Sequence, residues 1–247
     1  MAEGAAPPLD SWTTLAGTLA DASGSVIRKH FRRHSTVETK ADGSPVTAAD
    51  REAEAVMRAA IETEFPDHGI RGEEFTDHNG QAETVWVLDP IDGTRSFLTG
   101  KPVFTTLIAV LHHGTPVLGL IDQPVTRERW VGSASRPTTW NGAAARVRPC
   151  ASLERAAMYT TSTEWCGPEE RDAFERLRRK ALMTLYSADA YAFGLLTSGH
   201  IDVAIECQLD PHDFLALVPV VEGAGGIITD WEGKTPDPHG KANILAA

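Results

Sequence analysis

A short apolar run that ends in two closely spaced aspartates constrains this chain more than any other stretch. Residues 85–88 are apolar and β-prone, which is typical of a buried strand. The run leads into Asp89-Pro90-Ile91-Asp92-Gly93-Thr94, where the proline and the glycine force a turn. Two carboxylates, a carbonyl between them and a hydroxyl after them are all oxygen donors, which hard divalent cations prefer. The stretch therefore predicts a metal site at the end of a central strand.

The residues that follow this turn suit an anion. Ser96 and the amides after Gly93 could open a helix. The N-terminus of a helix attracts negative charge because its first amide hydrogens have no partners inside the helix. One turn would then combine a metal cluster with a seat for a phosphate group.

Composition and charge exclude several classes of protein. The chain has 247 residues, which fits one large domain or two modest domains that share a core. Its formal net charge of −11 argues against a nucleic acid as partner, because phosphate backbones attract basic faces. A small phosphorylated substrate remains compatible, since bound cations reverse the local field. The apolar runs are too short for a membrane span.

The N-terminus and the cysteines bear on the compartment. The start of the chain lacks a basic segment followed by an apolar one, so we expect no signal peptide and a cytoplasmic protein. Cys150, Cys166 and Cys207 are odd in number and widely spaced. They match neither a zinc site nor a disulfide framework, so we expect three reduced, buried bystanders.

Hydrophobic periodicity divides the chain near residue 150. Helices are expected over residues 9–34 and from Thr47 or Asp50 onward, with Thr47 as a candidate N-cap, and a meander of antiparallel strands over about 85–150. His112 and His113 fall at a turn of this meander, where we expect solvent exposure rather than metal binding.

After residue 150, helices and strands alternate, which favours an α/β arrangement. We therefore expect an α+β half, residues 1–150, that carries most of the metal ligands, and a smaller α/β half, residues 151–247. In the second half, a buried strand is expected to end at Glu206, and an apolar helix is expected over residues 214–221.

Five acidic residues recur at the predicted element boundaries. Each one alone has a plain structural explanation, as a charge at a helix end or on the surface. Together they indicate a functional site, because functional side chains collect on turns that a rigid sheet supports. Several like charges can converge only around cations, and two or three Mg²⁺ ions would allow it. The five are Asp50, Glu73, Asp89, Asp92 and Asp213.

The same residues resemble the motifs of the inositol monophosphatase-like Mg²⁺-dependent phosphatases. The family's Asp-Pro-Ile/Leu-Asp-Gly-Thr stands here as residues 89–94, and its Gly-Glu-Glu stands as residues 72–74. Its Val-Thr-x-x-Asp stands as residues 46–50. Its C-terminal aspartate, ahead of an apolar helix and an Ala-Gly-Gly, stands as Asp213 with residues 224–226. The motifs keep the family's order, and the resemblance covers nearly the whole chain.

Within this family the chain looks most like the histidinol-phosphate phosphatases. It departs from that group at residues 188–191, where Ala-Asp-Ala-Tyr replaces Gly-Asp-Cys-Tyr, and at residues 210–213, where Asp-Pro-His-Asp replaces Lys-Pro-Tyr-Asp. The C-terminal segment after the last family strand also looks short. These departures bear on the substrate more than on the reaction. The supporting stretches are residues 95–102, 118–125, 129–132, 222–226 and 229–231.

The resemblance implies a fold, a cofactor and a set of roles. The fold is a layered αβαβα sandwich, the cofactor is two or three Mg²⁺ ions, and the assembly is a homodimer. The implied metal ligands are Glu73, Asp89, Asp92, Asp213 and the carbonyl of Ile91. Asp50 and Thr94, with Glu73, would orient and deprotonate the attacking water. The amides of Gly93, Thr94 and Arg95 would hold the phosphate.

Three polar residues are candidates for contact with the leaving group. Histidinol carries an amine and an imidazole, which can both be cationic near neutral pH. Asp189 and Glu206 could pair with these cations, and Asn243 is a third polar candidate. The alternatives are a helix N-cap for Asp189 and a strand-end charge for Glu206.

The predicted activity is a Mg²⁺-dependent phosphomonoesterase that hydrolyses L-histidinol phosphate. One alternative is a phosphatase of the same family that acts on an inositol phosphate, a sugar phosphate or an intermediate of specialised metabolism. A second alternative is a non-catalytic relative that binds metal or ligand. The intact Asp50 and Thr94 speak against that relative, because a binding protein has no need to activate water.

Overall fold

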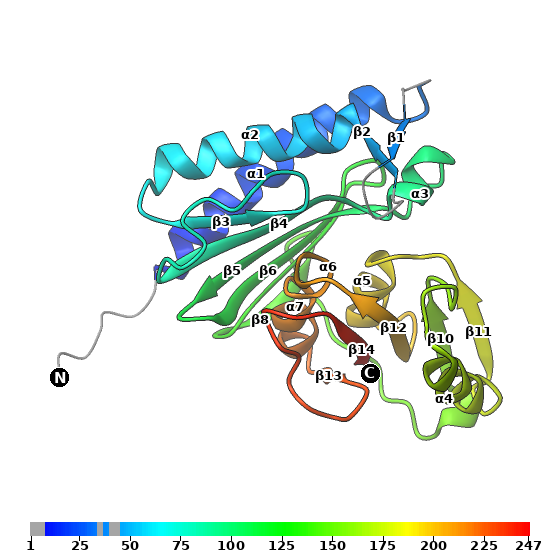
Figure 1. The fold of residues 1–247 in the computed structure, drawn as a ribbon. Coiled ribbons are helices and arrows are strands. Elements are labelled where there is room, and N and C mark those ends of the chain that lie inside the picture. The colour runs from blue at the N-terminus through cyan, green and yellow to red at the C-terminus, as the bar shows by residue number, and fades with distance from the viewer. Residues whose placement is uncertain (1–7, 34–36, 40–44) are drawn as a thin grey trace.

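The computed structural model of the chain describes residues 8–33, 37–39 and 45–247. Two long helices cover one face of a seven-stranded sheet, and a layer of short helices packs on its other face (Figure 1). A five-stranded sheet follows, and one more helix covers its outer face. This order of layers confirms the αβαβα sandwich that the resemblance implies.

The helices differ in length according to their layer. The outer pair is long, and the helices of the middle layer have one or two turns. A 3₁₀ turn spans Leu153–Arg155. The helices are α1 (Leu9–His30), α2 (Ala48–Glu64), α3 (Thr94–Leu98), α4 (Pro168–Arg178), α5 (Tyr191–Thr197), α6 (Pro211–Phe214) and α7 (Leu217–Gly223).

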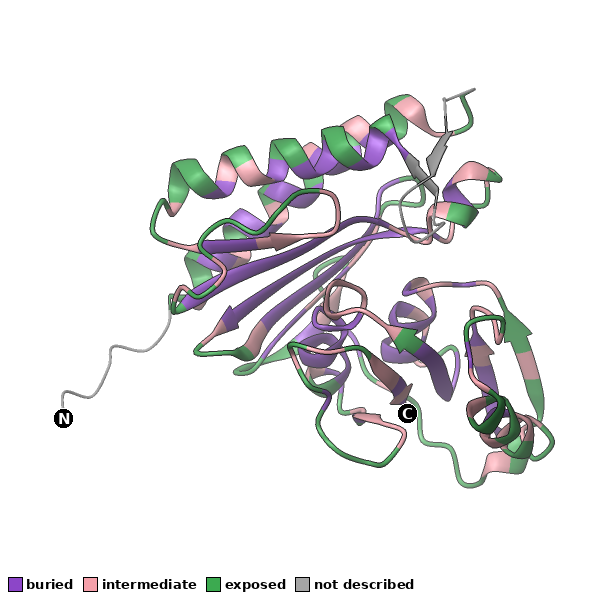
Figure 2. Ribbon diagram, in the orientation of Figure 1, coloured by how far each residue is buried: buried purple, intermediate pink, exposed green. Residues whose placement is uncertain are grey.

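The seven-stranded sheet is the predicted meander. Its strands follow the order of the sequence, and all neighbours are antiparallel except the first pair, β3 and β4. Figure 2 shows that its central strands are buried along most of their length, between the two helical layers. The strands are β3 (Gly69–Gly72), β4 (Thr84–Asp92), β5 (Thr105–His112), β6 (Thr115–Gln123), β7 (Glu128–Ser133), β8 (Arg136–Trp140) and β9 (Ala143–Ala144).

The second sheet is mixed. In the order β11-β10-β12-β14-β13, the first three strands are parallel, and β14 is antiparallel to both of its neighbours. A two-stranded ribbon, β1 (Val37–Thr39) and β2 (Pro45–Thr47), stands apart from both sheets. The strands of the second sheet are β10 (Ala157–Thr160), β11 (Met183–Tyr186), β12 (Val203–Leu209), β13 (Ile228–Asp230) and β14 (Ala242–Ala246).

The predicted helix boundaries hold at the starts of α1 and α2, and two others differ. Thr47 caps α2 as predicted, since its hydroxyl accepts a hydrogen bond from the amide of Ala49. The first helix ends at His30 instead of near residue 34, because Phe31 leaves the helix and packs against two other aromatic rings. The helix expected over residues 214–221 is divided, since Pro219 cannot donate to the carbonyl of Leu215.

Two glycines let the middle helical layer approach the first sheet. A Cβ on Gly119 would lie 2.0 Å from the carbonyl oxygen of Ala216, and one on Gly132 would lie 2.3 Å from that of Pro219. No side chain fits at either position. The close approach holds α7, and the short helix α6 before it, against the sheet that carries the two aspartates of the turn.

The prediction of three reduced, buried cysteines is wrong. Cys166 and Cys207 are buried and form a disulfide, while Cys150 is free and exposed. Cys166 stands just before α4, which packs across the outer face of β12, the strand that carries Cys207. The packing of a helix on a strand brings together two thiols that the linear sequence separates by 41 positions.

Three further predictions concern membrane spans, the division of the chain into two halves and the N-terminus. Within the described part of the chain, every helix is too short or too polar to cross a bilayer. The first sheet ends at residue 144 and the second begins at residue 157, and the division into two halves at residue 150 stays a prediction. Residues 1–7 and 34 lie outside the described residues, so the expected lack of a signal peptide is not addressed.

Candidate active site

An irregularity in β4 directs both aspartates of the turn to one side. Residues three apart on a regular strand point to opposite faces. Asp89 pairs with Leu107 and Asp92 with Thr105, so β4 holds one residue more than β5 between these pairs. Such a bulge turns the backbone locally and re-aims the side chains. The hydroxyl of Thr106 secures it by donating to the carbonyl of Pro90 over 2.8 Å.

Helix α6 brings a third carboxylate to the same place. Asp213 closes the first turn of this helix, where its Oδ2 accepts the amide hydrogen of Asp210 over 2.8 Å. One carboxylate oxygen each from Asp89, Asp92 and Asp213 lie within 4.8 Å of one another. Residues that are far apart in the sequence therefore form one compact cluster.

Glu73 and His212 extend this cluster on one side. Glu73 follows β3, and its amide donates to the carbonyl of Leu88 over 3.3 Å. One carboxylate oxygen of Glu73, one carboxylate oxygen of Asp89 and a ring nitrogen of His212 lie within 4.8 Å of one another. His212 also lies 3.4 Å from Asp213. No sequence motif assigns a role to this histidine.

The negative charges of the buried carboxylates repel one another. Burial raises the pKa of Asp89 well above its usual range, and the charges of Glu73 and Asp92 raise it further. Burial likewise raises the pKa of Asp92, with the charge of Asp189 adding to it, and the pKa of Asp213. A divalent cation would relieve this repulsion, and the all-carboxylate core of the cluster is what Mg²⁺ prefers.

Asp50 offers a second sign that the site is built for a hydrated cation. Its Oδ2 accepts hydrogen bonds from the amide and the hydroxyl of Thr47, over 2.8 and 2.6 Å. Its Oδ1 is buried and has no hydrogen-bond partner within the described residues. Burial raises the pKa of Asp50, and the charge of Glu73 adds to that rise. An unpartnered buried oxygen is costly, so this atom fits a water molecule that the site would hold.

The turn after Asp92 leads into the cavity. Gly93 has a φ of +83°, and the hydroxyl of Thr94 donates to the carbonyl of Ile91 over 3.2 Å. Gly93, Thr94 and Arg95 all line a cavity of about 500 Å³. The guanidinium of Arg95 lies 3.1 Å from Glu164 and 4.2 Å from the centre of the Trp165 ring, so its side chain is held at the rim.

Asp189 is packed tightly over the turn. Its Oδ2 accepts a hydrogen bond of 2.6 Å from Ser96, and a Cβ on Gly93 would lie only 2.6 Å from this oxygen. The alternative role as a helix cap is not observed, because Ala190 is the N-cap of α5. The amide of Ala190 donates to Asp92 over 2.7 Å and so ties this segment to the cluster.

Glu206 lies inside β12 and not at its end, because the strand continues to Leu209. It is buried, and it accepts hydrogen bonds from the amide and the hydroxyl of Thr161, over 2.6 and 2.8 Å. Burial raises the pKa of Glu206 to about 8. Both Glu206 and Asp189 line the cavity.

The structure does not bring Asn243 to this site. Its side chain accepts from the amide of Gln208 over 2.9 Å and donates to Glu170 over 2.7 Å. Among the described residues, Asn243 is not part of the cavity wall. Conversely, Thr161, Glu164 and Trp165 line the cavity although no motif marks them. The one available signal is a tryptophan in a polar loop, which is unusual enough to suggest a surface role.

These pKa shifts predict how Mg²⁺ and pH act together on stability. The carboxyls hold protons more tightly in the folded chain than in the unfolded one. Their contribution therefore favours folding below about pH 4 and is lost as the pH rises through about 8. We expect the metal-free protein to lose stability over this window, and Mg²⁺ to raise the melting temperature more as the pH rises.

Melting curves in chelator and in Mg²⁺, from pH 5 to 8.5, would measure this effect. Glu206→Gln should flatten the pH dependence of the metal-free protein, whereas Glu62→Gln, at an exposed position on α2, should leave it unchanged. A Mg²⁺ shift of the same size at every pH would contradict the prediction.

Comparison with known proteins agrees with this geometry. The "Bifunctional phosphatase IMPL2, chloroplastic" of Arabidopsis thaliana is 52% identical over 228 residues, which are 92% of this chain and 66% of that protein. The chain thus spans slightly less than two thirds of that relative's length. A histidinol-phosphatase of Chlorobaculum parvum is 35% identical over 234 residues, covering 94% of this chain and 90% of the relative.

Solved structures give the same result for the fold. An inositol monophosphatase from Zymomonas mobilis superposes with a TM-score of 0.89 at 44% identity, covering 98% of this chain and 94% of that one. Residues 8–247 match the inositol monophosphatase family. With the family's motifs in order, its layered fold and a carboxylate cluster where the motifs meet, the chain belongs to the inositol monophosphatase family.

Proposed function

We propose that this chain is a Mg²⁺-dependent phosphomonoesterase whose substrate is L-histidinol phosphate. The observation that carries the proposal is the compact cluster of Asp89, Asp92 and Asp213 beside a cavity with further acids in its wall. The carboxylate cluster, which would hold the metal ions, suits a phosphate ester. The acidic wall suits a leaving group that carries positive charge.

Each residue of the cluster receives a role in this proposal. Asp89, Asp92, Asp213, Glu73 and the carbonyl of Ile91 would hold two or three Mg²⁺ ions. When bound, Mg²⁺ neutralises charge on the phosphate oxygens and favours ionisation of a coordinated water. The amides of Gly93, Thr94 and Arg95 would hold the phosphate group.

Asp50 and Thr94 would handle the attacking water. Thr47 fixes Oδ2 of Asp50 with two hydrogen bonds, which leaves Oδ1 to accept a proton. The hydroxyl of Thr94 stands beside the carbonyl of Ile91, where it can accept a hydrogen bond from the water and orient it. Such positioning lowers the entropic cost of the attack in line with the leaving oxygen.

The acidic wall of the cavity supports histidinol as the leaving group. Asp189 and Glu206 line it from within, and Glu164 stands at the rim. An amine and an imidazole could each pair with one of these acids. The histidinol-phosphatase of Chlorobaculum parvum adds support, at 35% identity over nearly the whole chain.

One assay would test this assignment. Phosphate release from L-histidinol phosphate should exceed release from inositol 1-phosphate and should depend on added Mg²⁺. A higher kcat/KM for inositol 1-phosphate would favour the alternative of an inositol phosphatase, which the similarity to the Zymomonas mobilis enzyme supports. Sugar phosphates and intermediates of specialised metabolism belong in the same panel. Metal binding without turnover of any ester would favour a non-catalytic relative.

Glu206→Gln should separate recognition of the leaving group from catalysis. Because the carboxylate can pair with a cation, we expect a higher KM for L-histidinol phosphate and little change in kcat. A neutral ester should show no such change in KM. Glu206 also receives two hydrogen bonds from Thr161, and glutamine keeps an oxygen to accept them. Equal effects on the charged and the neutral ester would contradict the assigned role.

Assembly and compartment complete the proposal. A homodimer is proposed from the family resemblance, and a small phosphorylated metabolite is the proposed partner. The cytoplasm is proposed from the sequence, while the name of the Arabidopsis thaliana relative places that protein in the chloroplast.

A further inference from the structure

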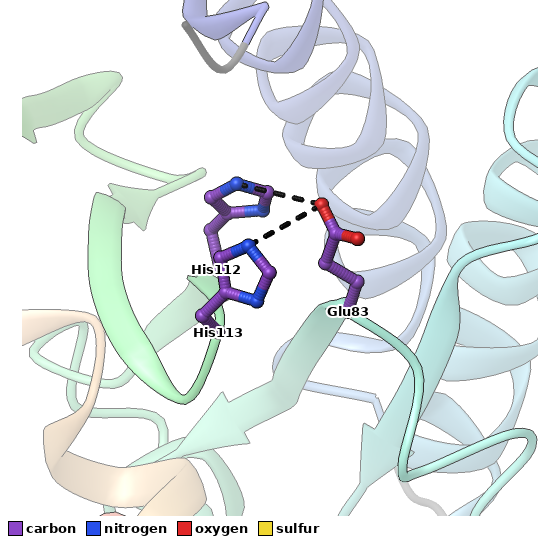
Figure 3. Close-up of side chains that lie close together, drawn as sticks. All are labelled: Glu83, His112 and His113. Carbon is purple, nitrogen blue, oxygen red and sulfur yellow. Dashed lines mark ion pairs between the residues drawn. The ribbon is translucent and has the colours of Figure 1, made fainter. Parts of the chain in front are cut away.

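A second group of metal-ligating side chains lies at the end of β4 that is remote from the catalytic aspartates. β4 begins at Thr84, and β5 ends at His112, directly opposite. Figure 3 shows Glu83 before β4 and His112 and His113 at the end of β5, with the three side chains turned toward one another. None of the three lines the cavity described above.

The distances within this group are short. Oε1 of Glu83 lies 3.7 Å from Nε2 of His112 and 3.5 Å from Nε2 of His113. One ligand atom from each of the three lies within 4.8 Å of the other two. The backbone fixes the arrangement, because the amide of His113 donates to the carbonyl of Glu83 over 2.8 Å.

His112 is held in one orientation. The expected solvent exposure of the histidine pair is confirmed for His113, whose side chain is 69% exposed, but not for His112, at 19%. The His112 ring packs against Trp12, with ring centres 5.5 Å apart, and its Nδ1 lies 3.1 Å from the hydroxyl of Thr84. With its proton on Nδ1, the ring donates to Thr84 and turns the lone pair of Nε2 toward Glu83.

We propose that Glu83, His112 and His113 form an accessory site for a borderline divalent cation, with Zn²⁺ as the reference ion. Two imidazoles and one carboxylate suit Zn²⁺, Ni²⁺ and Cu²⁺, whereas Mg²⁺ prefers a set made of oxygens alone. Three protein ligands leave a fourth position to water. The hydrogen bond from His112 to Thr84 is the outer contact that such ligands commonly have.

The proposal departs from the expectation that these two histidines face solvent rather than bind metal. An ion pair between Glu83 and protonated histidines is the competing explanation of the same distances, since exposed ion pairs of this kind are common and weak. The two explanations differ in one measurable respect. An ion pair has no need of a metal, whereas the proposed site binds one Zn²⁺ ion per chain.

Titration calorimetry with Zn²⁺ would decide between them. The protein would be treated with chelator and then saturated with Mg²⁺, so that the catalytic carboxylates are occupied. All variants would carry Cys150→Ser, which removes the exposed thiol. We expect one Zn²⁺ site that His112→Asn and His113→Asn each abolish, separate from the Zn²⁺ that displaces Mg²⁺ near His212 in every variant. His78→Asn, at an exposed histidine outside the group, should keep it.

Two further variants keep the test informative if the histidine variants misfold. Glu83→Gln changes an exposed side chain and should weaken Zn²⁺ binding without affecting the fold. Thr84→Val removes only the outer contact and should weaken binding by about 10- to 100-fold. Histidine NMR should place the Zn²⁺-induced shifts on Nε2 of His112 and His113. No Zn²⁺ binding to the parent protein, or equal binding by the His112 and His78 variants, would overturn the proposal whether or not the protein is a phosphatase.

Discussion

Replacing Asp89 with asparagine should lower kcat by about 10³-fold or more. Asp89 belongs both to the group with Asp92 and Asp213 and to the group with Glu73 and His212. It is therefore the residue that would contribute most to holding Mg²⁺. Loss of its charge would weaken that hold, and with it the neutralisation of charge in the transition state.

The fold should survive this substitution. Oδ1 of Asp89 accepts the amide hydrogen of Ile91 over 3.0 Å, and an asparagine oxygen can take its place. Removing one of several crowded negative charges also relieves repulsion. We therefore expect the metal-free variant to melt at or above the temperature of the metal-free parent. Steady-state kinetics at several Mg²⁺ concentrations and melting curves in chelator measure the two effects separately.

Asp122 provides a matched control. It is also buried, but its Oδ1 is paired with Arg129 over 2.7 Å, outside the cavity. Asp122→Asn should cost stability, because it removes the buried one of the two carboxylates that pair with the Arg129 guanidinium and leaves only the exposed Asp21, and it should spare kcat. If Asp89→Asn retained near-normal turnover, the cluster would not be the catalytic centre.

The turn that carries two of the three clustered aspartates can be predicted from short-range spacing in the sequence. A buried strand, a proline and a glycine set the turn at residues 89–94, and the bulge then aims both aspartates to one side. The cap of α2 is local too, and it places Asp50 through hydrogen bonds from Thr47, three positions earlier. Short-range spacing is sufficient to predict such features.

The periphery of the site is harder to predict because it depends on contacts between distant segments. Asn243 is drawn away from the cavity by Gln208 and Glu170, a pairing that no local pattern reveals. Glu206 lies within a strand, and its carboxylate is held by the amide and the hydroxyl of Thr161, which belongs to a distant segment. His212 joins the cluster because two glycines of the first sheet let α7, and with it α6, come close.

The disulfide is the clearest case of a contact that the sequence does not predict, and it carries the second large effect. Breaking the bond between Cys166 and Cys207 should lower the free energy of unfolding by about 4 kcal/mol, the chain-entropy value for a separation of this length. The bond joins α4 and the segment before it to β12, so the reduced chain gains more conformational freedom when unfolded than when folded.

Urea unfolding with and without a thiol reductant would measure the loss. Cys207→Ser should reproduce it, and reductant should then have no further effect on that variant. Cys150→Ser, at the exposed free thiol, should leave the unfolding midpoint unchanged. If the reduced and oxidised parent proteins unfold at the same urea concentration, the bond does not contribute to stability in solution.

The disulfide also borders the substrate cavity, so reducing it should affect activity as well as stability. Cys166 follows Glu164 and Trp165 at the rim, and Cys207 follows Glu206 in the wall. Breaking the bond frees this rim from the strand that bears Glu206, while the cluster of Asp89, Asp92 and Asp213 lies on other elements. We therefore expect reduction to raise KM more than it lowers kcat. A fall in kcat with KM unchanged would show instead that the bond supports the metal cluster.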